Sequence, residues 1–184
     1  MKKRYQEYNR FQSQLDLPFL ETPKQSLQEL FQILELKFGL TKGSNQKLVD
    51  LGSGNGQVVI FSATNYHIKS IGVELNQELI KEAKERINAK RNEPFVKKKD
   101  IKRIKILNLD FYQINLSSYD FIYIYSLPTM QKYLKHLFFT IKEGTIVISY
   151  KYPLEGYENV LNLEYVLEAG ENEYRINSFF YRKF

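Results

Sequence analysis

Apolar and polar positions alternate along the chain in two different rhythms. Short runs of mostly apolar residues, bounded by polar or glycine-containing turns, are typical of buried strands. Longer segments in which apolar residues return every three or four positions are typical of amphipathic helices. The first rhythm predicts strands at 47–51, 70–74, 104–109, 120–125, 145–150, 160–168 and 174–183, and the second predicts helices at 22–38, 57–65, 76–88 and 129–142.

The order of these elements predicts the fold class. Strands that alternate with helices are typical of an α/β protein with a doubly wound, Rossmann-like sheet. The last two runs are separated only by a turn at 169–172, so they predict an antiparallel C-terminal strand hairpin at one edge. The sequence therefore predicts a seven-stranded, mostly parallel sheet. We expect a single domain over 1–184 with its core in 47–184.

Residues 1–46 are expected to form a helical segment that covers this core. Spaced aromatic residues within 1–17 are compatible with an amphipathic helix. Thr22 is expected to cap the next helix, and Pro23 suits its first turn. Gln25 stands three residues after Thr22, which is the spacing of a capping box.

Composition narrows the class of protein. With 43% hydrophobic and 26% charged residues, the chain resembles an ordinary globular domain, and no apolar run reaches the roughly 18 residues that span a bilayer. No apolar stretch follows the basic start at 1–4, so we expect no signal peptide and a cytoplasmic protein. There is no cysteine, and His67 and His136 lack metal-ligand spacing, so we expect no metal site.

Positive charge is concentrated in one place, the basic segment 89–105. Eight basic residues stand there against Glu93 and Asp100, and this accounts for the whole net charge of +6. Such a segment can bind nucleic acid, a ribosome or an acidic protein. In a chain rich in lysine and asparagine, however, the pattern alone slightly favours a solvated connection.

A glycine-rich loop follows the first predicted strand and carries the clearest functional signal. Gly52, Gly54 and Gly56 alternate with Ser53 and other small or polar residues after Asp50. The spacing differs from the dinucleotide fingerprint, and no Gly-Lys-Ser/Thr ending makes a phosphate loop. Because an acid precedes the loop, the ligand expected there is a cation rather than a phosphate. The alternative is a glycine-rich turn in an unrelated α/β protein.

A second acid, Glu74, ends the second strand eighteen residues after the loop. An acid near this spacing is placed to accept hydrogen bonds from ribose hydroxyls. The run Asp50 to Gly56 resembles motif I of the class I S-adenosylmethionine-dependent methyltransferases, and the predicted sheet resembles theirs. S-adenosylmethionine carries an ammonium and a sulfonium and no phosphate, so it is the expected cofactor.

Position along the strands assigns further roles. Asp50 and the loop backbone are expected to hold the methionine end of the cofactor, and Glu74 the ribose. At the end of strand three, Asp110 is placed to accept from the adenine amine, with Phe111 beside the ring. The alternatives are a turn acid for Asp110 and core packing for Tyr125. The end of strand four is expected to face the acceptor, through Tyr125, Ser126 and Leu127.

The chain from Thr22 onward resembles a narrower group, the non-SET protein lysine methyltransferases of the archaeal broad-specificity and mitochondrial types. The resemblance rests on Thr22-Pro23, the glycine block, Gly72-Val73-Glu74-Leu75-Asn76, Tyr125-Ser126-Leu127-Pro128, and Lys142 to Ser149. It implies that Thr22 joins the cofactor site, with Leu75 beside Glu74, and that the partner is a protein with an accessible lysine. Lysine transfer needs a neutral amine, which an apolar aromatic channel favours. Candidate walls are Tyr125, Tyr150 and Tyr152.

Two other classes of function stay open from the sequence. The first is an RNA methyltransferase that uses the basic segment, although the tetrad after strand four lacks the Asp/Asn-Pro-Pro-Tyr pattern of enzymes that methylate base amines. The second is a non-catalytic cofactor-binding protein. The glycine loop with its ribose and adenine acids speaks against the second class, but it predicts binding and not turnover.

Overall fold

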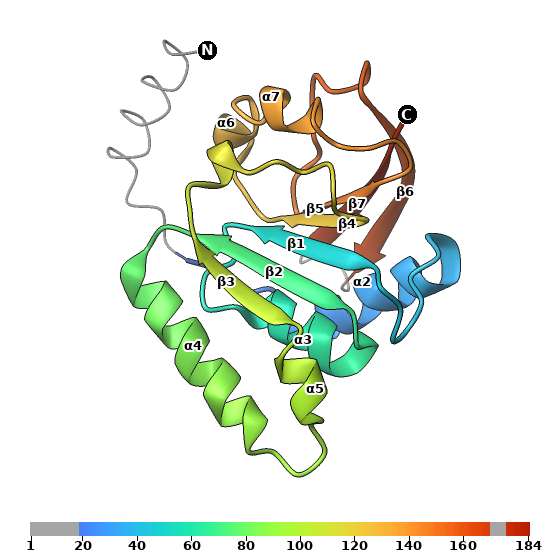
Figure 1. Cartoon of the computed structure of the whole chain (residues 1–184). Coiled ribbons are helices and arrows are strands. Elements are labelled where there is room, and N and C mark those ends of the chain that lie inside the picture. Colours follow the sequence, from blue (N-terminus) through green and yellow to red (C-terminus); the bar gives the residue numbers. More distant parts are fainter. Residues whose placement is uncertain (1–18, 170–175) are drawn as a thin grey trace.

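The computed structural model describes residues 19–169 and 176–184. The helix expected within 1–17 and most of the turn expected at 169–172 lie outside these ranges. The described elements, in chain order, are α2 (Lys24–Lys37), β1 (Lys47–Leu51), α3 (Gln57–Tyr66), β2 (Lys69–Glu74), α4 (Gln77–Arg91), α5 (Lys98–Ile101), β3 (Ile104–Asn108), the 3-10 turn η1 (Phe111–Gln113), β4 (Phe121–Ile124), α6 (Pro128–Gln131), α7 (Lys135–Phe138), β5 (Ile146–Tyr150), β6 (Leu161–Ala169) and β7 (Ile176–Lys183) (Figure 1).

The seven strands form one sheet in the order β3-β2-β1-β4-β5-β7-β6. The pairs from β3 through β5 are parallel, and β7 is antiparallel to both of its neighbours. This confirms the predicted doubly wound α/β fold with its antiparallel C-terminal hairpin. The strand order reverses between β1 and β4. Ligands in open α/β sheets bind at such a reversal, beyond the carboxyl ends of the strands.

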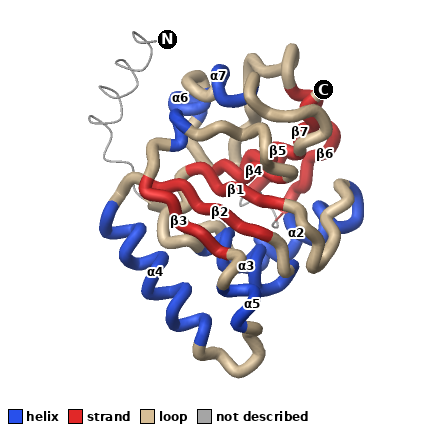
Figure 2. The backbone as a smooth tube through the Cα atoms, viewed as in Figure 1, coloured by secondary structure: helices blue, strands red, loops and turns tan. Residues whose placement is uncertain are grey.

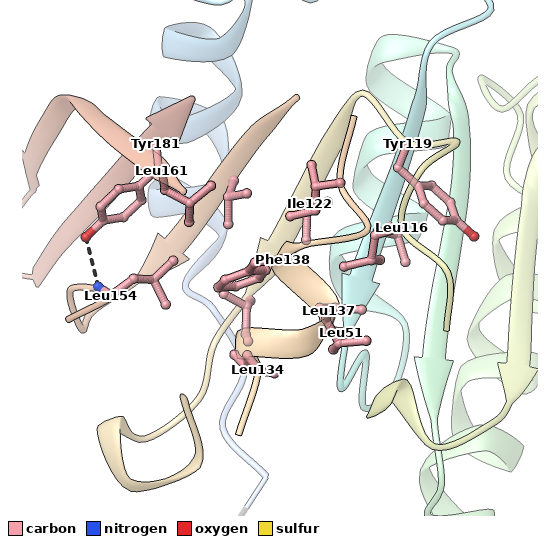
Figure 3. Close-up of a cluster of buried hydrophobic side chains, with 14 of the residues drawn as sticks. Leu51, Leu116, Tyr119, Ile122, Leu134, Leu137, Phe138, Leu154, Leu161 and Tyr181 are labelled. Atoms are coloured by element: carbon pink, nitrogen blue, oxygen red, sulfur yellow. Dashed lines mark hydrogen bonds between the residues drawn. The ribbon is translucent and has the colours of Figure 1, made fainter. Parts of the chain in front are cut away.

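Helices α3 and α4 lie on one side of the sheet and α6 and α7 on the other (Figure 2), and two hydrophobic clusters pack against the strands. One joins α2 and α3 to the strands, and buries the predicted face of α2, namely Leu27, Leu30, Phe31 and Leu34. The other joins the strands to the region after β4, with Leu134, Leu137 and Phe138 packed near Ile122 (Figure 3). Tyr181 of β7 holds the loop between β5 and β6, because its hydroxyl accepts a 2.8 Å hydrogen bond from the N–H of Leu154. Strands β1 and β4, which flank the reversal point, contribute buried side chains to both clusters.

The predicted capping of the first described helix is wrong. Pro23 is the N-cap residue of α2, no side chain caps the helix, and Gln25 donates instead to Glu29. The Thr22 hydroxyl lies 2.6 Å from the hydroxyl of Tyr123 on β4. A long-range hydrogen bond between two buried side chains has therefore replaced the local cap.

The single helix predicted at 129–142 is also wrong, since two short helices, α6 and α7, occupy this region. The backbone tightens between them: the N–H of Tyr133 donates to Met130 O and that of Leu134 to Gln131 O. The Gln131 carbonyl also accepts a hydrogen bond from the buried Tyr157 hydroxyl. A carbonyl held in this way no longer serves a continuous helix, so the chain turns and buries Leu134 against the sheet.

Candidate functional site

A pocket of about 450 Å³ opens at the carboxyl edge of the sheet, where the strand order reverses between β1 and β4. Its walls come from the ends of β1 to β5 and the segments that follow them, and from residues 19–22, which precede α2. The lining residues are Phe19, Leu20, Glu21, Thr22, Asp50, Leu51, Gly52, Ser53, Gln57, Val58, Glu74, Asn76, Leu79, Phe111, Tyr123, Tyr125, Ser126, Leu127, Met130 and Tyr152.

The charge of this pocket is one-sided. Glu21, Asp50 and Glu74 are acidic, and none of the described residues that line it is a lysine, arginine or histidine. Arg86 pairs with Glu21 from outside the lining, so the uncompensated acids in the described part of the lining are Asp50 and Glu74. A phosphate group would meet like charge beside them, whereas an ammonium or sulfonium would meet opposite charge. The pocket therefore suits a cationic ligand.

Asp50 is the most unusual ionisable group in the pocket. Its side chain is buried, and the described residues give its carboxylate no hydrogen bond. Burial raises the pKa of Asp50 well above its usual range, and the negative charge of Glu74 adds to this effect. A cation bound beside Asp50 would favour its charged form.

Glu74 ties the glycine loop to the end of β2. One carboxylate oxygen accepts hydrogen bonds from the N–H groups of Leu75 (2.8 Å) and Asn76 (2.9 Å), and the other accepts from Gly54 (2.9 Å). A carboxylate has roughly four acceptor sites. Three are used by the backbone, which leaves capacity for a ligand hydroxyl on the oxygen that faces Gly54.

At two positions in this region a neighbouring side chain comes so close that there is room only for glycine. Gly54 has a φ of +51°, and a Cβ atom placed there would overlap the ring of Phe19. A Cβ atom at Gly72 would overlap the side chain of Ser53. The loop is therefore shaped by what packs on it as well as by its own turn.

Residues 19–22, which we call the entry segment, lie along the mouth of the pocket and are held at several points. The N–H of Thr22 donates to Gln57 Oε1 at 3.1 Å, while its hydroxyl meets Tyr123. Glu21 Oε1 accepts from Arg86 Nη1 at 2.6 Å and also from Asn55. These bonds join the entry segment to α3, α4 and β4.

The end of β4 forms the opposite wall. Ser126 has a buried hydroxyl with no hydrogen-bond partner among the described residues, and its carbonyl accepts from Gln131 Nε2 at 3.3 Å. Leu127 is 36% exposed at the rim. The buried hydroxyl of Ser53 on the glycine loop likewise lacks a partner there. Such orphaned hydroxyls, facing one pocket from two sides, are groups that a polar ligand would satisfy.

Tyrosines support this wall in two layers. Tyr125 and Tyr152 line the pocket, as does Tyr123, which the sequence analysis did not single out. Tyr150 lies behind them, with its ring edge-on to Tyr125 at 4.9 Å and its hydroxyl donating to Ser26 Oγ. Burial raises the pKa of Tyr123 well above the usual range of a phenol, so this hydroxyl stays neutral.

The structure brings most of the predicted site residues together. Nine of them line the pocket: Thr22, Asp50, Gly52, Ser53, Glu74, Phe111, Tyr125, Ser126 and Leu127. Gly54, Gly56, Leu75 and Asp110 do not line it. Asp110 instead caps η1, where its side chain accepts from the N–H of Tyr112 at 2.9 Å.

Several lining residues were missed by sequence reasoning. Gln57 directly follows the glycine block, so its position was a usable signal. Tyr123 lies two residues before Tyr125 in β4, on the same face of the strand, which was a second signal. Phe19, Glu21 and Met130 reach the pocket only through the paths of the entry segment and of the bent region after β4, and no local pattern marks them.

Two negative observations apply to residues 19–169 and 176–184. No group of three or more histidine, cysteine, aspartate or glutamate side chains is arranged to hold a metal ion. No helix in these ranges has the length and apolar character needed to cross a membrane.

A family model described as the ANTKMT methyltransferase domain matches residues 50–160. No curated protein sequence matches the chain. Among solved structures, an RNA methyltransferase from Salinibacter ruber, in complex with S-adenosyl-L-homocysteine, is 22% identical with a TM-score of 0.68 and covers 89% of this chain and 93% of its own.

Two further solved structures share the fold at lower identity. The magnesium protoporphyrin IX methyltransferase of Synechocystis PCC 6803, with bound S-adenosylmethionine, is 13% identical with a TM-score of 0.64, covering 86% of this chain and 78% of its own. The B. subtilis m1A22 tRNA methyltransferase is 15% identical with a TM-score of 0.63, covering 90% and 68%. At these identities the likeness concerns the fold alone.

Proposed function

The chain belongs to the ANTKMT methyltransferase domain family, and on that premise we propose that it is an S-adenosylmethionine-dependent enzyme that methylates lysine side chains of proteins. The observation that carries the proposal is the acidic pocket at the carboxyl edge. It has three carboxylates, no lining cation among the described residues and an aromatic wall. A cationic cofactor suits the carboxylates, and an amine acceptor suits the aromatic wall.

The residues present fit the cofactor. Asp50 would hold the ammonium of the methionine end, because its buried carboxylate has no other partner among the described residues. Glu74 would accept from the ribose hydroxyls with its remaining capacity, and Phe111 would lie beside the adenine. The bound cofactor supplies an electrophilic methyl group on a positively charged sulfur. The chain's part is to orient the acceptor in line with that group and to exclude water.

The wall after β4 is suited to a neutral amine. Tyr125, Tyr152 and Met130 offer aromatic and apolar surface, which disfavours an ammonium relative to the free amine. Ser126 has a buried hydroxyl to orient the incoming nitrogen. None of the described lining residues is a histidine or lysine that would act as a base, so loss of the proton to solvent before transfer is the simplest course. The rate is therefore expected to rise with pH above neutrality.

The test is incubation of the protein with labelled S-adenosylmethionine and cell lysate, followed by separate protease and RNase digestion. We expect protease-sensitive label, located on lysine by mass spectrometry, and a rate that climbs with pH. Label found only in RNA would favour the second candidate, an RNA methyltransferase. The observation that supports this candidate is the basic segment. Tight cofactor binding with no label anywhere would favour a non-catalytic cofactor-binding protein.

A further inference from the structure

The basic segment lies at the amino edge of the sheet, opposite the pocket. It comprises the last turn of α4, a connecting turn, α5 and the start of the edge strand β3 (Figure 1). This region is more ordered than a plain connection. Asp100 and Ile101 of α5 are buried, and Asp100 Oδ2 lies 2.9 Å from His67 Nδ1 at the end of α3. The backbone that presents the cations is thus fixed on the core.

The cations of this segment are mostly unpaired. Lys90 pairs with Glu93 at 2.7 Å, and Arg103 lies 3.9 Å from the buried Asp100. The other six have no carboxylate partner among the described residues: Arg91, Lys97, Lys98, Lys99, Lys102 and Lys105. Strand β2, which neighbours β3 in the sheet, adds the exposed Lys69 at the same edge. Uncompensated charge of one sign, held close together, attracts a polyanion.

An exposed aromatic ring stands within these cations. Phe95 is 97% exposed, more than any other large hydrophobic residue described, and it precedes the three consecutive lysines 97–99. An aromatic side chain beside cations is the combination that binds single-stranded nucleic acid, because bases stack on the ring while phosphates meet the charges. A membrane surface would require a wider apolar face, and Ile101, the apolar residue of α5, is already buried.

We propose that Phe95, Arg91 and the cations of α5 and its flanks form a docking surface for single-stranded nucleic acid. The phosphates bind the six unpaired cations, and one base stacks on Phe95. The surface is separate from the pocket: α4 begins beside the lining residue Asn76 and ends at Arg91, a span of about 22 Å for its 15 residues. The inference goes beyond the proposed function and does not rest on it, because binding is measured without turnover.

The experiment measures binding of fluorescent oligouridine and oligodeoxythymidine of about 16 nucleotides by anisotropy, from about 50 to about 200 mM salt. For six cations on a single strand, log K should fall with log salt with a slope of about −4. Replacing Lys97, Lys98 and Lys99 by Gln should reduce that slope by about 2 and weaken low-salt binding at least about tenfold. Phe95→Ala should weaken binding about tenfold with the slope unchanged.

The matched control removes three exposed, unpaired lysines elsewhere, through Lys24→Gln, Lys81→Gln and Lys135→Gln. It should leave the affinity close to that of the original protein. The proposal is overturned if both triple variants lose affinity equally, or if the unaltered protein fails to bind either oligonucleotide at low salt. Binding to phosphatidylserine vesicles or to an acidic protein, without oligonucleotide binding, would also overturn it. A preference between RNA and DNA identifies which nucleic acid is bound, and either preference supports the surface.

Discussion

Two buried aspartates lie at opposite edges of the same sheet, and the molecule treats them differently. Asp100, at the amino edge, is 1% exposed and lies 2.9 Å from His67, with Arg103 at 3.9 Å. Asp50, at the carboxyl edge, is 3% exposed, accepts no hydrogen bond from the described residues and faces a second carboxylate, Glu74. The chain places basic side chains beside the first acid, whose Oδ1 still accepts no hydrogen bond, and it places a second carboxylate beside the other.

Under the proposed function, the difference is that between an acid that supports the fold and an acid kept for a ligand. Burying a charge is costly unless it is paired, so a fold selected for stability alone would treat both in the manner of Asp100. Asp50 carries this cost at the place where the strand order reverses and the pocket opens. We infer that its missing partner is the ligand.

The largest expected effect comes from Asp50→Asn. Loss of the charge opposite the ammonium should weaken S-adenosylmethionine binding by about 2–3 kcal/mol, or roughly 100-fold, and activity should fall with it. Isothermal titration calorimetry gives the affinity, and circular dichroism checks that the fold is intact. A folded variant with normal affinity and turnover would show that Asp50 does not meet the cofactor.

Asp100→Asn should show the opposite profile. Weakening the contact with His67 should lower the free energy of unfolding by about 2 kcal/mol, measured by urea denaturation, because the contact joins α5 to α3. Cofactor affinity of the folded variant should be unchanged, because the pair lies at the other edge of the sheet. If calorimetry finds that this variant loses affinity as Asp50→Asn does, the division of roles is wrong.

Glu74→Gln should have an intermediate effect on the pocket. The amide keeps one oxygen acceptor, whereas the carboxylate uses both oxygens for backbone N–H groups and retains capacity for a ribose hydroxyl. We expect about tenfold weaker binding of S-adenosylhomocysteine by calorimetry. Glu78→Gln, an exposed acid in the first turn of α4, is the matched control and should bind normally. Equal losses in both variants would indicate a general charge effect.

The smallest expected effect is on the pH dependence of the free energy of unfolding. Because the pKa of Asp50 is raised in the fold, the folded chain binds more protons than the unfolded chain between the ordinary value of 3.8 and the raised one. The free energy of unfolding therefore falls as pH rises through this window. Relative to Asp50→Asn, the cofactor-free protein should therefore lose stability between about pH 4 and about pH 8.

Urea denaturation at several pH values checks this prediction. Glu78→Gln serves as the reference, since it retains Asp50, removes only an exposed acid and should show the same decline as the unaltered protein. A stability difference between the unaltered protein and Asp50→Asn that stays constant with pH would contradict a raised pKa for Asp50.

The strands and the sheet were predictable because the apolar runs are short, separate and strongly periodic. The first strand was predicted at 47–51 and is observed at Lys47–Leu51. The errors lie where distant contacts outweigh local signals. Thr22 was expected to cap a helix, but its hydroxyl meets Tyr123, 101 residues away. The region after β4 was expected to be one helix, but the Tyr157 hydroxyl donates a hydrogen bond to the Gln131 carbonyl there. A local pattern carries no information about either partner.

The pocket was predictable to the extent that it is built from strand ends. Asp50 and Glu74 lie at the ends of β1 and β2, and Phe111 and Tyr125 follow β3 and β4. These four strands are neighbours in one sheet, so the convergence of the residues follows from the fold. The entry segment was not predictable in the same way, because Glu21 reaches the site through Arg86 of α4. The roles of the predicted residues toward a cofactor or an acceptor stay predictions, which the variants above test.

The length of helix α4 affects which acceptor groups can reach the pocket. The helix starts beside the pocket and ends in the basic segment, so it sets a fixed spacing of about 22 Å between them. If nucleic acid docks at the far end of α4, the length of the helix fixes the distance between the bound strand and the pocket. Only acceptor groups that project about this distance from the strand then reach the pocket. Geometry would then select among many equivalent lysines, without any recognition of the sequence around them.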